Sequence, residues 1–338
     1  MTKPAELMHN KRYNTINFIL RLIYPMSLLF AIVFLSFTCS NKYAEKGYQQ
    51  SVDNSISIPT KREFSMPFIP DSIKRPEHRA AYLVSNYWNN FDLADTTYIH
   101  LPDITEQAFV DYLDILPHLA IDDVHCSISN MLDKAIEMDT THKVYLYFLE
   151  LYKSYLLDAN SPMLNEEIYI TVANYILEDT VSNIAVKERA RFNLSMMLKN
   201  RKGNIATDII YTTDKAETSN LHSLNKAYTL LYFYNPDCHA CKETSTYLME
   251  SPVIKGLLEK GRLDILALYS DEDICLWKKY IMHIPSLWIN AYDKEQSLRS
   301  GLLYDLKAIP SLYLLDSKKR VLLKNTNEIV VERYLYGE

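Results

Sequence analysis

The spacing of apolar residues divides the chain into four regions. Residues 22–37 are almost continuously apolar, and the stretch 40–66 that follows is polar and rich in Ser, Lys, Glu, Asn and Gln. Apolar residues then recur at helical spacing up to about residue 200, after which short apolar runs alternate with helical segments. The pattern predicts a targeting segment (1–39), a tether (40–66), an all-α domain (67–200) and an α/β domain (201–338).

Helical periodicity is clearest in the middle of the all-α region. Phe109, Tyr112, Leu113 and Leu116 follow an i, i+3, i+4, i+7 pattern, and Pro117 ends it. The same spacing recurs in the neighbouring segments. It predicts roughly six amphipathic helices, without a fixed repeat period.

The α/β region contains a stretch in which a strand leads directly into two cysteines. Tyr228–Tyr234 is apolar or aromatic except for one threonine, and the turn residues Asn235–Asp237 interrupt it. A continuous apolar run between turn residues is typical of a strand buried on both faces. Cys238 and Cys241 follow at the start of a helix-forming segment, so both sulfurs lie on one helix face at a spacing that allows a disulfide.

The position of Cys238 at a helix start favours redox chemistry. Free backbone N–H groups and the helix dipole stabilise a thiolate there, and the thiolate is the form that attacks disulfides. Cys238 is therefore the expected nucleophile, and Cys241, one turn deeper, the resolving thiol. A structural zinc site would usually need a second cysteine or histidine pair, which the segment lacks.

Further apolar runs complete the expected α/β domain. Alternating strands and helices predict a sheet that begins with parallel strands and right-handed crossovers. Trp277 and Trp288, with Tyr292, are interpreted either as core residues or as the lining of a substrate groove. The expected strands are Ile205–Tyr211, Leu263–Tyr269, Ser311–Leu315 and Val321–Lys324, and the expected helices are Asp271–Met282 and Asn327–Leu335.

Three segments together give the C-terminal region a family resemblance. They are Phe233–Cys241 (FYNPDCHAC), Ala308–Leu323 (AIPSLYLLDSKKRVLL) and Gly203–Tyr211 (GNIATDIIY). With them, Tyr228–Leu335 resembles a thioredoxin fold, most closely that of the membrane-tethered TlpA/ResA-type thiol-disulfide oxidoreductases. The resemblance implies a thioredoxin-like α/β domain after the helical one, and a cis peptide at Ile309-Pro310 that faces the cysteines.

The resemblance also implies a function and a set of site residues. The chain is expected to exchange electrons with protein thiols and disulfides and with a redox partner, and to need no cofactor or metal. Cys238 and Cys241 would carry the exchange, and His239 would tune the thiolate. Pro310 would shape the docking surface, and Ile309 would offer backbone hydrogen bonds to the substrate.

The sequence departs from the family pattern beside the cysteines. Asp237 stands where thioredoxins usually have tryptophan, and His239-Ala240 replaces the usual Gly-Pro. Tyr232 replaces the buried aspartate that helps to deprotonate the resolving cysteine. Asp237 should raise the pKa of Cys238, whereas a protonated His239 should lower it.

The N-terminal residues resemble a lipoprotein signal. Lys3, Lys11, Arg12 and Arg21 precede the apolar stretch, which ends at Cys39. In this interpretation Cys39 becomes the lipidated first residue; the alternative is an uncleaved membrane anchor. Either places residues 40–338 outside the cytoplasm, where disulfide exchange is useful. With the family resemblance, the expected location is the envelope of a Gram-negative-type bacterium, facing the periplasm.

The helical region resembles a second known domain. The segment Tyr87–Ile104 (YWNNFDLADTTYIHLPDI) is similar to a helical domain of unknown function that precedes thioredoxin-like domains in lipoproteins of gut-type Gram-negative bacteria. This resemblance implies family membership and no particular chemistry.

Composition argues against several other classes of function. The chain of 338 residues has a net charge of −6 and no basic block, which argues against nucleic-acid binding. It has only 6 glycines and no glycine-rich phosphate loop, so nucleotide binding through such a loop is not expected. The remaining alternatives are a scaffold lipoprotein that kept the fold, and a metal carrier using Cys238, Cys241 and His239.

The cysteine count does not decide whether Cys126 and Cys275 form a disulfide. If Cys39 carries lipid and Cys238 pairs with Cys241, Cys126 and Cys275 remain of the 5 cysteines. They are either free or joined in a disulfide between the two domains.

Overall fold

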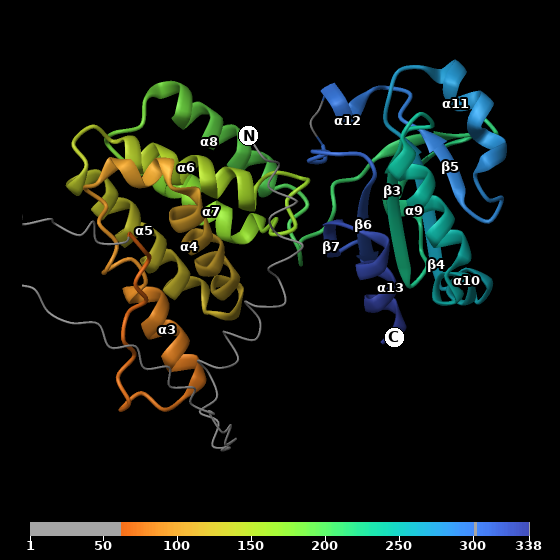
Figure 1. Cartoon of the computed structure of the whole chain (residues 1–338). Helices are drawn as coiled ribbons and strands as arrows, with labels where there is room; N and C mark the ends of the chain where they lie inside the picture. The colour runs from red at the N-terminus through yellow and green to blue at the C-terminus, as the bar shows by residue number, and fades with distance from the viewer. Residues whose placement is uncertain (1–61, 301–302, 338) are drawn as a thin grey trace, which may run out of the picture. The chain divides into compact units, whose positions relative to one another are not determined.

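The structure is a computed structural model that describes residues 62–300 and 303–337 (Figure 1). The expected targeting segment, Cys39 and nearly all of the expected tether lie outside these residues. The chain divides into two compact units, Met1–Leu151 and Tyr152–Glu338. The boundary falls inside helix α6, and the expected domain division after residue 200 stays a prediction.

The described part of the first unit is helical, as its periodicity predicts. In the predicted helix the residues Phe109, Tyr112, Leu113 and Leu116 are all buried. The elements of this unit are α3 (Pro76–Asn86), a 3-10 turn (Thr96–His100), α4 (Pro102–Ile115), a second 3-10 turn (Leu116–His118), α5 (Ile121–Met138) and the first part of α6 (Lys143–Leu156).

Aromatic side chains form the centre of this helical core. The Trp88 ring lies 5.2 Å from Tyr87, 5.5 Å from Phe91, 5.6 Å from Tyr112 and 5.2 Å from Phe148, measured between centroids. Each contact is edge-on, which suits the quadrupoles of the rings and adds about 0.5–1.5 kcal/mol per pair to the burial itself. Aromatic packing therefore stabilises the first unit.

The second unit begins with helices and continues as a seven-stranded sheet in the order β2-β1-β5-β4-β3-β6-β7. Its elements are the end of α6, α7 (Glu166–Glu178), α8 (Ile184–Met197), β1 (Ile210–Thr213), β2 (Thr218–Asn220), a 3-10 turn (Leu221–Ser223), β3 (Tyr228–Tyr234), α9 (His239–Glu250), α10 (Pro252–Glu259), β4 (Leu263–Tyr269), α11 (Ile274–Tyr280), a 3-10 turn (Ile281–His283), β5 (Ile289–Tyr292), α12 (Ser297–Ser300), β6 (Ser311–Asp316), β7 (Val321–Thr326) and α13 (Glu328–Tyr336).

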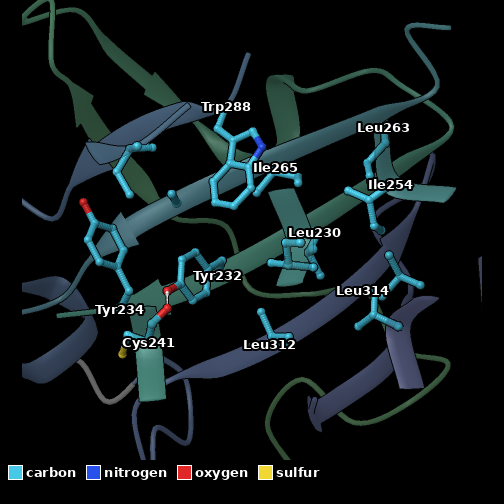
Figure 2. Close-up of a cluster of buried hydrophobic side chains, with 14 of the residues drawn as sticks. Leu230, Tyr232, Tyr234, Cys241, Ile254, Leu263, Ile265, Trp288, Leu312 and Leu314 are labelled. Carbon is cyan, nitrogen blue, oxygen red and sulfur yellow. Dashed lines mark hydrogen bonds between the residues drawn. The ribbon is translucent and has the colours of Figure 1, made fainter. Parts of the chain in front are cut away.

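Strand β3 lies inside the sheet, as its apolar run predicts. It pairs in parallel with β4 along its whole length and antiparallel with β6. Leu230, Tyr232 and Tyr234 enter one core (Figure 2). Leu231 and Phe233 enter the other. The expected α/β arrangement is thus confirmed. Burial on both faces fixes the register of β3 and the place where it ends.

Helices α9, α10 and α13 supply the side chains that cover one face of the sheet. Trp277 of α11 and Trp288 join the same core and are 2% and 6% exposed. Both are therefore core residues, which is one of the two interpretations; the other is the lining of a substrate groove.

The predicted strand Ile205–Tyr211 is mostly wrong. Strand β1 begins only at Ile210, and Ile205 makes an isolated bridge to Arg320. The reason is local: the Asp208 carboxylate accepts hydrogen bonds from the backbone N–H groups of Ile209 and His222. This side chain competes with a regular ladder and bends the segment before β1.

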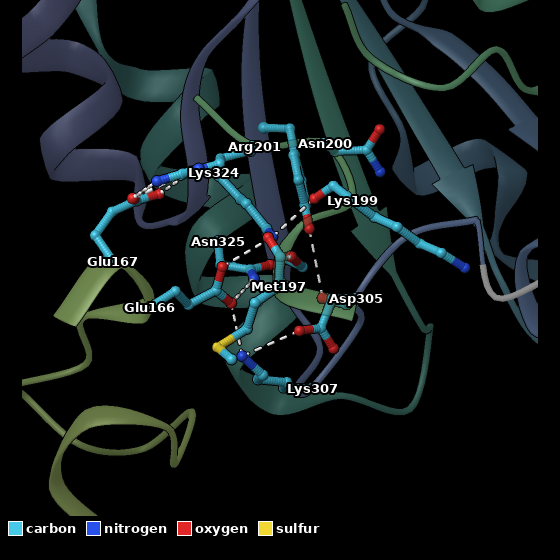
Figure 3. Close-up of polar contacts among 12 residues, drawn as sticks. Glu166, Glu167, Met197, Lys199, Asn200, Arg201, Asp305, Lys307, Lys324 and Asn325 are labelled. Carbon is cyan, nitrogen blue, oxygen red and sulfur yellow. Dashed lines mark hydrogen bonds and ion pairs between the residues drawn. The ribbon is translucent and has the colours of Figure 1, made fainter. Parts of the chain in front are cut away.

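A partly buried ion cluster joins α7 to the loop before β6 (Figure 3). Lys307 Nζ lies 2.6 Å from Glu166 Oε1, and Lys324 Nζ lies 2.8 Å from Glu166 Oε2. Asn325 donates a hydrogen bond of 3.2 Å to the same carboxylate, and Lys307 also lies 3.0 Å from Asp305. Because Lys307 precedes Ile309 by two residues, the cluster anchors the loop that reaches the cysteines.

Charge determines the protonation of Glu166. Burial by itself raises the pKa of this carboxyl, but the charges and hydrogen bonds of Lys324 and Lys307 outweigh it, so the pKa lies below its ordinary value of 4.5. A lowered carboxyl pKa contributes stability that is present above the unfolded-state value and is lost as the pH falls through the folded-state value.

We expect Glu166→Gln to lower the free energy of unfolding by about 2 kcal/mol at neutral pH, because the partly buried Lys324 ammonium loses its counter-charge and that of Lys307 keeps only Asp305. The loss should shrink below pH 4.5, where the wild-type carboxyl also becomes protonated and loses its contribution. Urea unfolding at several pH values measures both effects.

The neighbouring Glu167 provides a matched control. Its carboxylate pairs with Arg201, but the two side chains are 49% and 43% exposed, so solvent screens the pair. Glu167→Gln should change the free energy of unfolding by no more than about 0.5 kcal/mol. Equal losses in the two variants would contradict the assigned role of the Glu166 cluster.

Candidate active site

The turn after β3 is shaped by Asn235. Its side-chain oxygen accepts a hydrogen bond of 3.0 Å from the Asp237 N–H, and its carbonyl accepts one of 3.1 Å from the Cys238 N–H. Its amide nitrogen donates to Asp271 at 3.2 Å. A short polar side chain that bonds its own backbone favours a turn, which here ends the strand and begins α9.

The two cysteines form a disulfide at the start of α9, with their Cα atoms 5.2 Å apart. Cys238 is the N-cap residue, and its Sγ accepts a hydrogen bond of 3.1 Å from the Cys241 N–H. Cys238 is half-buried, whereas Cys241 is 2% exposed and belongs to the core (Figure 2). The pair is therefore asymmetric, with one sulfur near the surface and one beneath it.

The loop before β6 approaches the nearer sulfur. The Ile309-Pro310 peptide is cis, as the family resemblance implies. The Ile309 carbonyl oxygen lies 3.5 Å from Cys238 Sγ. The structure thus brings together Cys238, Cys241, Ile309 and Pro310, which the sequence places about seventy residues apart.

Tyr232 lies beneath the deeper cysteine. Its hydroxyl donates a hydrogen bond of 2.6 Å to the Cys241 carbonyl (Figure 2). Burial, helped by nearby Tyr280, Tyr234 and Glu328, raises the pKa of Tyr232 well above its ordinary value. The hydroxyl therefore stays protonated and acts as a donor, so it does not replace the usual aspartate as a base.

The carboxylate of Glu328 nevertheless contacts α9 close to Tyr232. Thr244, one turn beyond Cys241 and 4% exposed, donates a hydrogen bond of 3.1 Å to Glu328 Oε2 at the start of α13. The charge of Glu328 is among those that act on Tyr232. The sequence pattern gives no sign of this carboxylate, because it comes from a helix 87 positions after Cys241.

His239 is placed at the surface. Its side chain is 88% exposed, and its Nε2 lies 3.3 Å from Glu243 Oε1 one turn along α9. The expected tuning of the thiolate by His239 stays a prediction.

The structure also describes the two cysteines outside the pair and the groups that could bind a metal ion. Cys126 and Cys275 are both free and exposed. Within residues 62–300 and 303–337, no three His, Cys, Asp or Glu side chains come close enough together to bind a metal ion. The same residues include no helix with the length and apolar character that crossing a membrane requires.

Known proteins resemble this chain both in its helical region and as a whole. The sequence model of DUF5106, a domain of unknown function, matches residues 38–200. A crystal structure of a thioredoxin-like protein from Bacteroides caccae is 42% identical and covers 82% of this chain and 100% of that one, with a TM-score of 0.78. The chain therefore belongs to the thioredoxin-like proteins, with a DUF5106 region at its N-terminal side.

Two other matches cover smaller shares of this chain. The C-terminal domain of an uncharacterized Bacteroides fragilis protein is 44% identical and covers 40% of this chain and 98% of that chain, with a TM-score of 0.40. Nucleoredoxin of Xenopus laevis is 26% identical over 121 residues, which are 36% of this chain and 28% of nucleoredoxin. This chain thus spans little more than a quarter of that curated relative.

We expect Tyr232→Phe to lower the free energy of unfolding of the oxidised protein by about 1 kcal/mol, because it removes one buried hydrogen bond without opening a cavity. Chemical denaturation under oxidising conditions measures the loss. Tyr336→Phe is the control, since Tyr336 is 81% exposed and its substitution should leave stability unchanged. A Tyr232→Phe protein as stable as wild type would show that the bond to Cys241 contributes nothing.

Proposed function

We propose that this protein is a thiol-disulfide oxidoreductase that exchanges electrons with protein disulfides through Cys238 and Cys241. The observation that carries the proposal is the asymmetry of the pair: Cys238 is half-buried at the N-cap of α9, and Cys241 is buried one turn further on. Nucleophilic attack needs an accessible sulfur, and release of the product needs a second sulfur within reach.

The reaction proceeds in two balanced steps. In the reduced protein the Cys238 thiolate attacks a substrate disulfide, forms a mixed disulfide and releases one substrate sulfur as a thiolate. Cys241 then loses its proton and attacks Cys238 in the mixed disulfide. This step releases the second substrate sulfur and forms the Cys238–Cys241 disulfide, so that the substrate gains two electrons. With an oxidised protein and a dithiol substrate, the same steps run in reverse.

Local geometry supports the role of each sulfur. The Cys241 N–H that now donates to Cys238 Sγ would donate to the thiolate after reduction, and α9 directs its positive end at the same atom. Both effects stabilise the charged form of Cys238. The Ile309 carbonyl and Pro310 border the sulfur and offer a place where a substrate backbone can dock.

The proposal includes a location. Lipidation at Cys39 would hold the chain on a membrane of the cell envelope, facing the periplasm. The apolar run 22–37 that ends at this cysteine and the polar residues after it support this arrangement. In that oxidising compartment protein disulfides are available as substrates.

We expect Cys241→Ser to accumulate mixed disulfides, because Cys238 can attack but nothing resolves the product. Cys238→Ser should form none, since Cys241 is buried and cannot reach a protein substrate. The test incubates the reduced proteins, with Cys39, Cys126 and Cys275 replaced by serine, with a disulfide-bonded protein. Non-reducing electrophoresis and mass spectrometry then detect the adducts.

The same pair of variants identifies failure of the proposal. A Cys241→Ser protein that stays free in the presence of excess disulfide substrate contradicts an exchange function. A Cys238→Ser protein that forms adducts as readily as Cys241→Ser contradicts the assignment of Cys238 as the nucleophile.

A further inference from the structure

A groove begins beside the cysteines and runs between α9 and α11, the helices labelled in Figure 1. Its volume is about 560 Å³. Pro236 and Asp237, the residues just before Cys238, line one end. Lys242, the residue just after Cys241, lines it from α9. A chain segment lying in this groove would therefore be next to the site of disulfide exchange.

The walls of the groove are partly apolar. Met249 of α9 and Leu276 and Tyr280 of α11 line it. The Tyr280 ring lies 6.0 Å from the Tyr234 ring, which connects this wall to the core, and 5.0 Å from the His283 ring, which also lines the groove. Such a surface gives an extended peptide apolar contact on a rigid support.

The charge of the groove is predominantly positive. Lys242 and Lys279 line it from opposite helices, and Asp237 is the carboxylate on its lining. Both lysines are exposed, and neither ammonium makes an ion pair with the residues that the structure describes. By contrast, Lys307 and Lys324 of the same unit are held by carboxylates. The groove thus presents two ammonium groups and one carboxylate, that of Asp237, so its lining carries a net positive charge.

The acidic residues nearby are engaged elsewhere. Glu243 of α9 lies against His239. Glu272 lies 2.7 Å from Arg299. Asp273 caps α11 by accepting a hydrogen bond from the Leu276 N–H. None of these three carboxylates forms an ion pair with Lys242 or Lys279.

We propose that this groove binds an acidic segment of the substrate protein next to the disulfide that Cys238 attacks. The inference rests on the proposed function and names the class of its substrate. Carboxylates of the bound segment pair with Lys242 and Lys279, and its apolar side chains contact Met249 and Tyr280. Because charge attraction acts before contact, an acidic substrate also associates faster than a basic one.

The test separates binding from electron exchange. Two cysteine-free synthetic peptides of equal length, one rich in glutamate and one rich in lysine, are titrated into the oxidised full-length protein by isothermal calorimetry. We expect the acidic peptide to bind at least about fivefold more tightly, and the preference to fall as salt is added.

Adjacent lysines on α11 provide the matched pair of variants. Lys279→Glu, which lines the groove, should remove the preference for the acidic peptide. Lys278→Glu makes the same change of charge on the same exposed helix, but Lys278 does not line the groove, so the preference should remain. Equal effects of the two variants would indicate a general charge effect and overturn the inference.

Exchange kinetics distinguish the two proposals. The same flanking sequences are placed around a disulfide, and the reaction is followed with these peptides and with a small neutral disulfide. A protein that reduces the small disulfide but binds and reduces both peptides equally refutes the groove and leaves the proposed function intact. A protein that binds the acidic peptide selectively but reduces none of the disulfides refutes the function and leaves the groove.

Discussion

Burial of β3 on both faces is the constraint on which the rest of the C-terminal unit depends. Its alternate side chains enter two separate cores, and its backbone is paired on both sides with β4 and β6. A strand held in this way cannot slip by one residue without placing its side chains in the wrong core. The turn at Asn235, the start of α9 and the position of Cys238 all follow from where β3 ends.

The sequence predicts the local part of the site because local patterns determine it. The apolar run, the Asn-Pro-Asp turn and the cysteines after it define a strand, a turn and a capped helix, and the structure has all of them. The resemblance to known sequences adds the cis peptide at Pro310. The segment before β1 is mispredicted, because its apolar residues suggest a strand while the Asp208 side chain takes the hydrogen bonds that would continue it.

Contacts between distant segments could not be predicted from such patterns. Glu166 looks like an ordinary acidic residue in the first turn of a helix, yet it is the counter-charge for Lys307 and Lys324. Glu328 reaches Thr244 beneath the site, and Lys279 faces Lys242 across a groove, although no spacing in the sequence relates them. The cysteine pair is thus encoded locally, whereas its support and the proposed docking surface depend on the completed fold.

The most direct test of the account is a redox titration of the protein with Cys39, Cys126 and Cys275 replaced by serine. Equilibration in glutathione or dithiothreitol buffers, followed by alkylation and mass spectrometry, gives the fraction of Cys238 and Cys241 that is reduced. The account predicts one reversible two-electron transition between about −270 and −120 mV, the range of known dithiol exchange proteins. A pair that stays oxidised across this range, or that never forms a disulfide, would contradict the central claim.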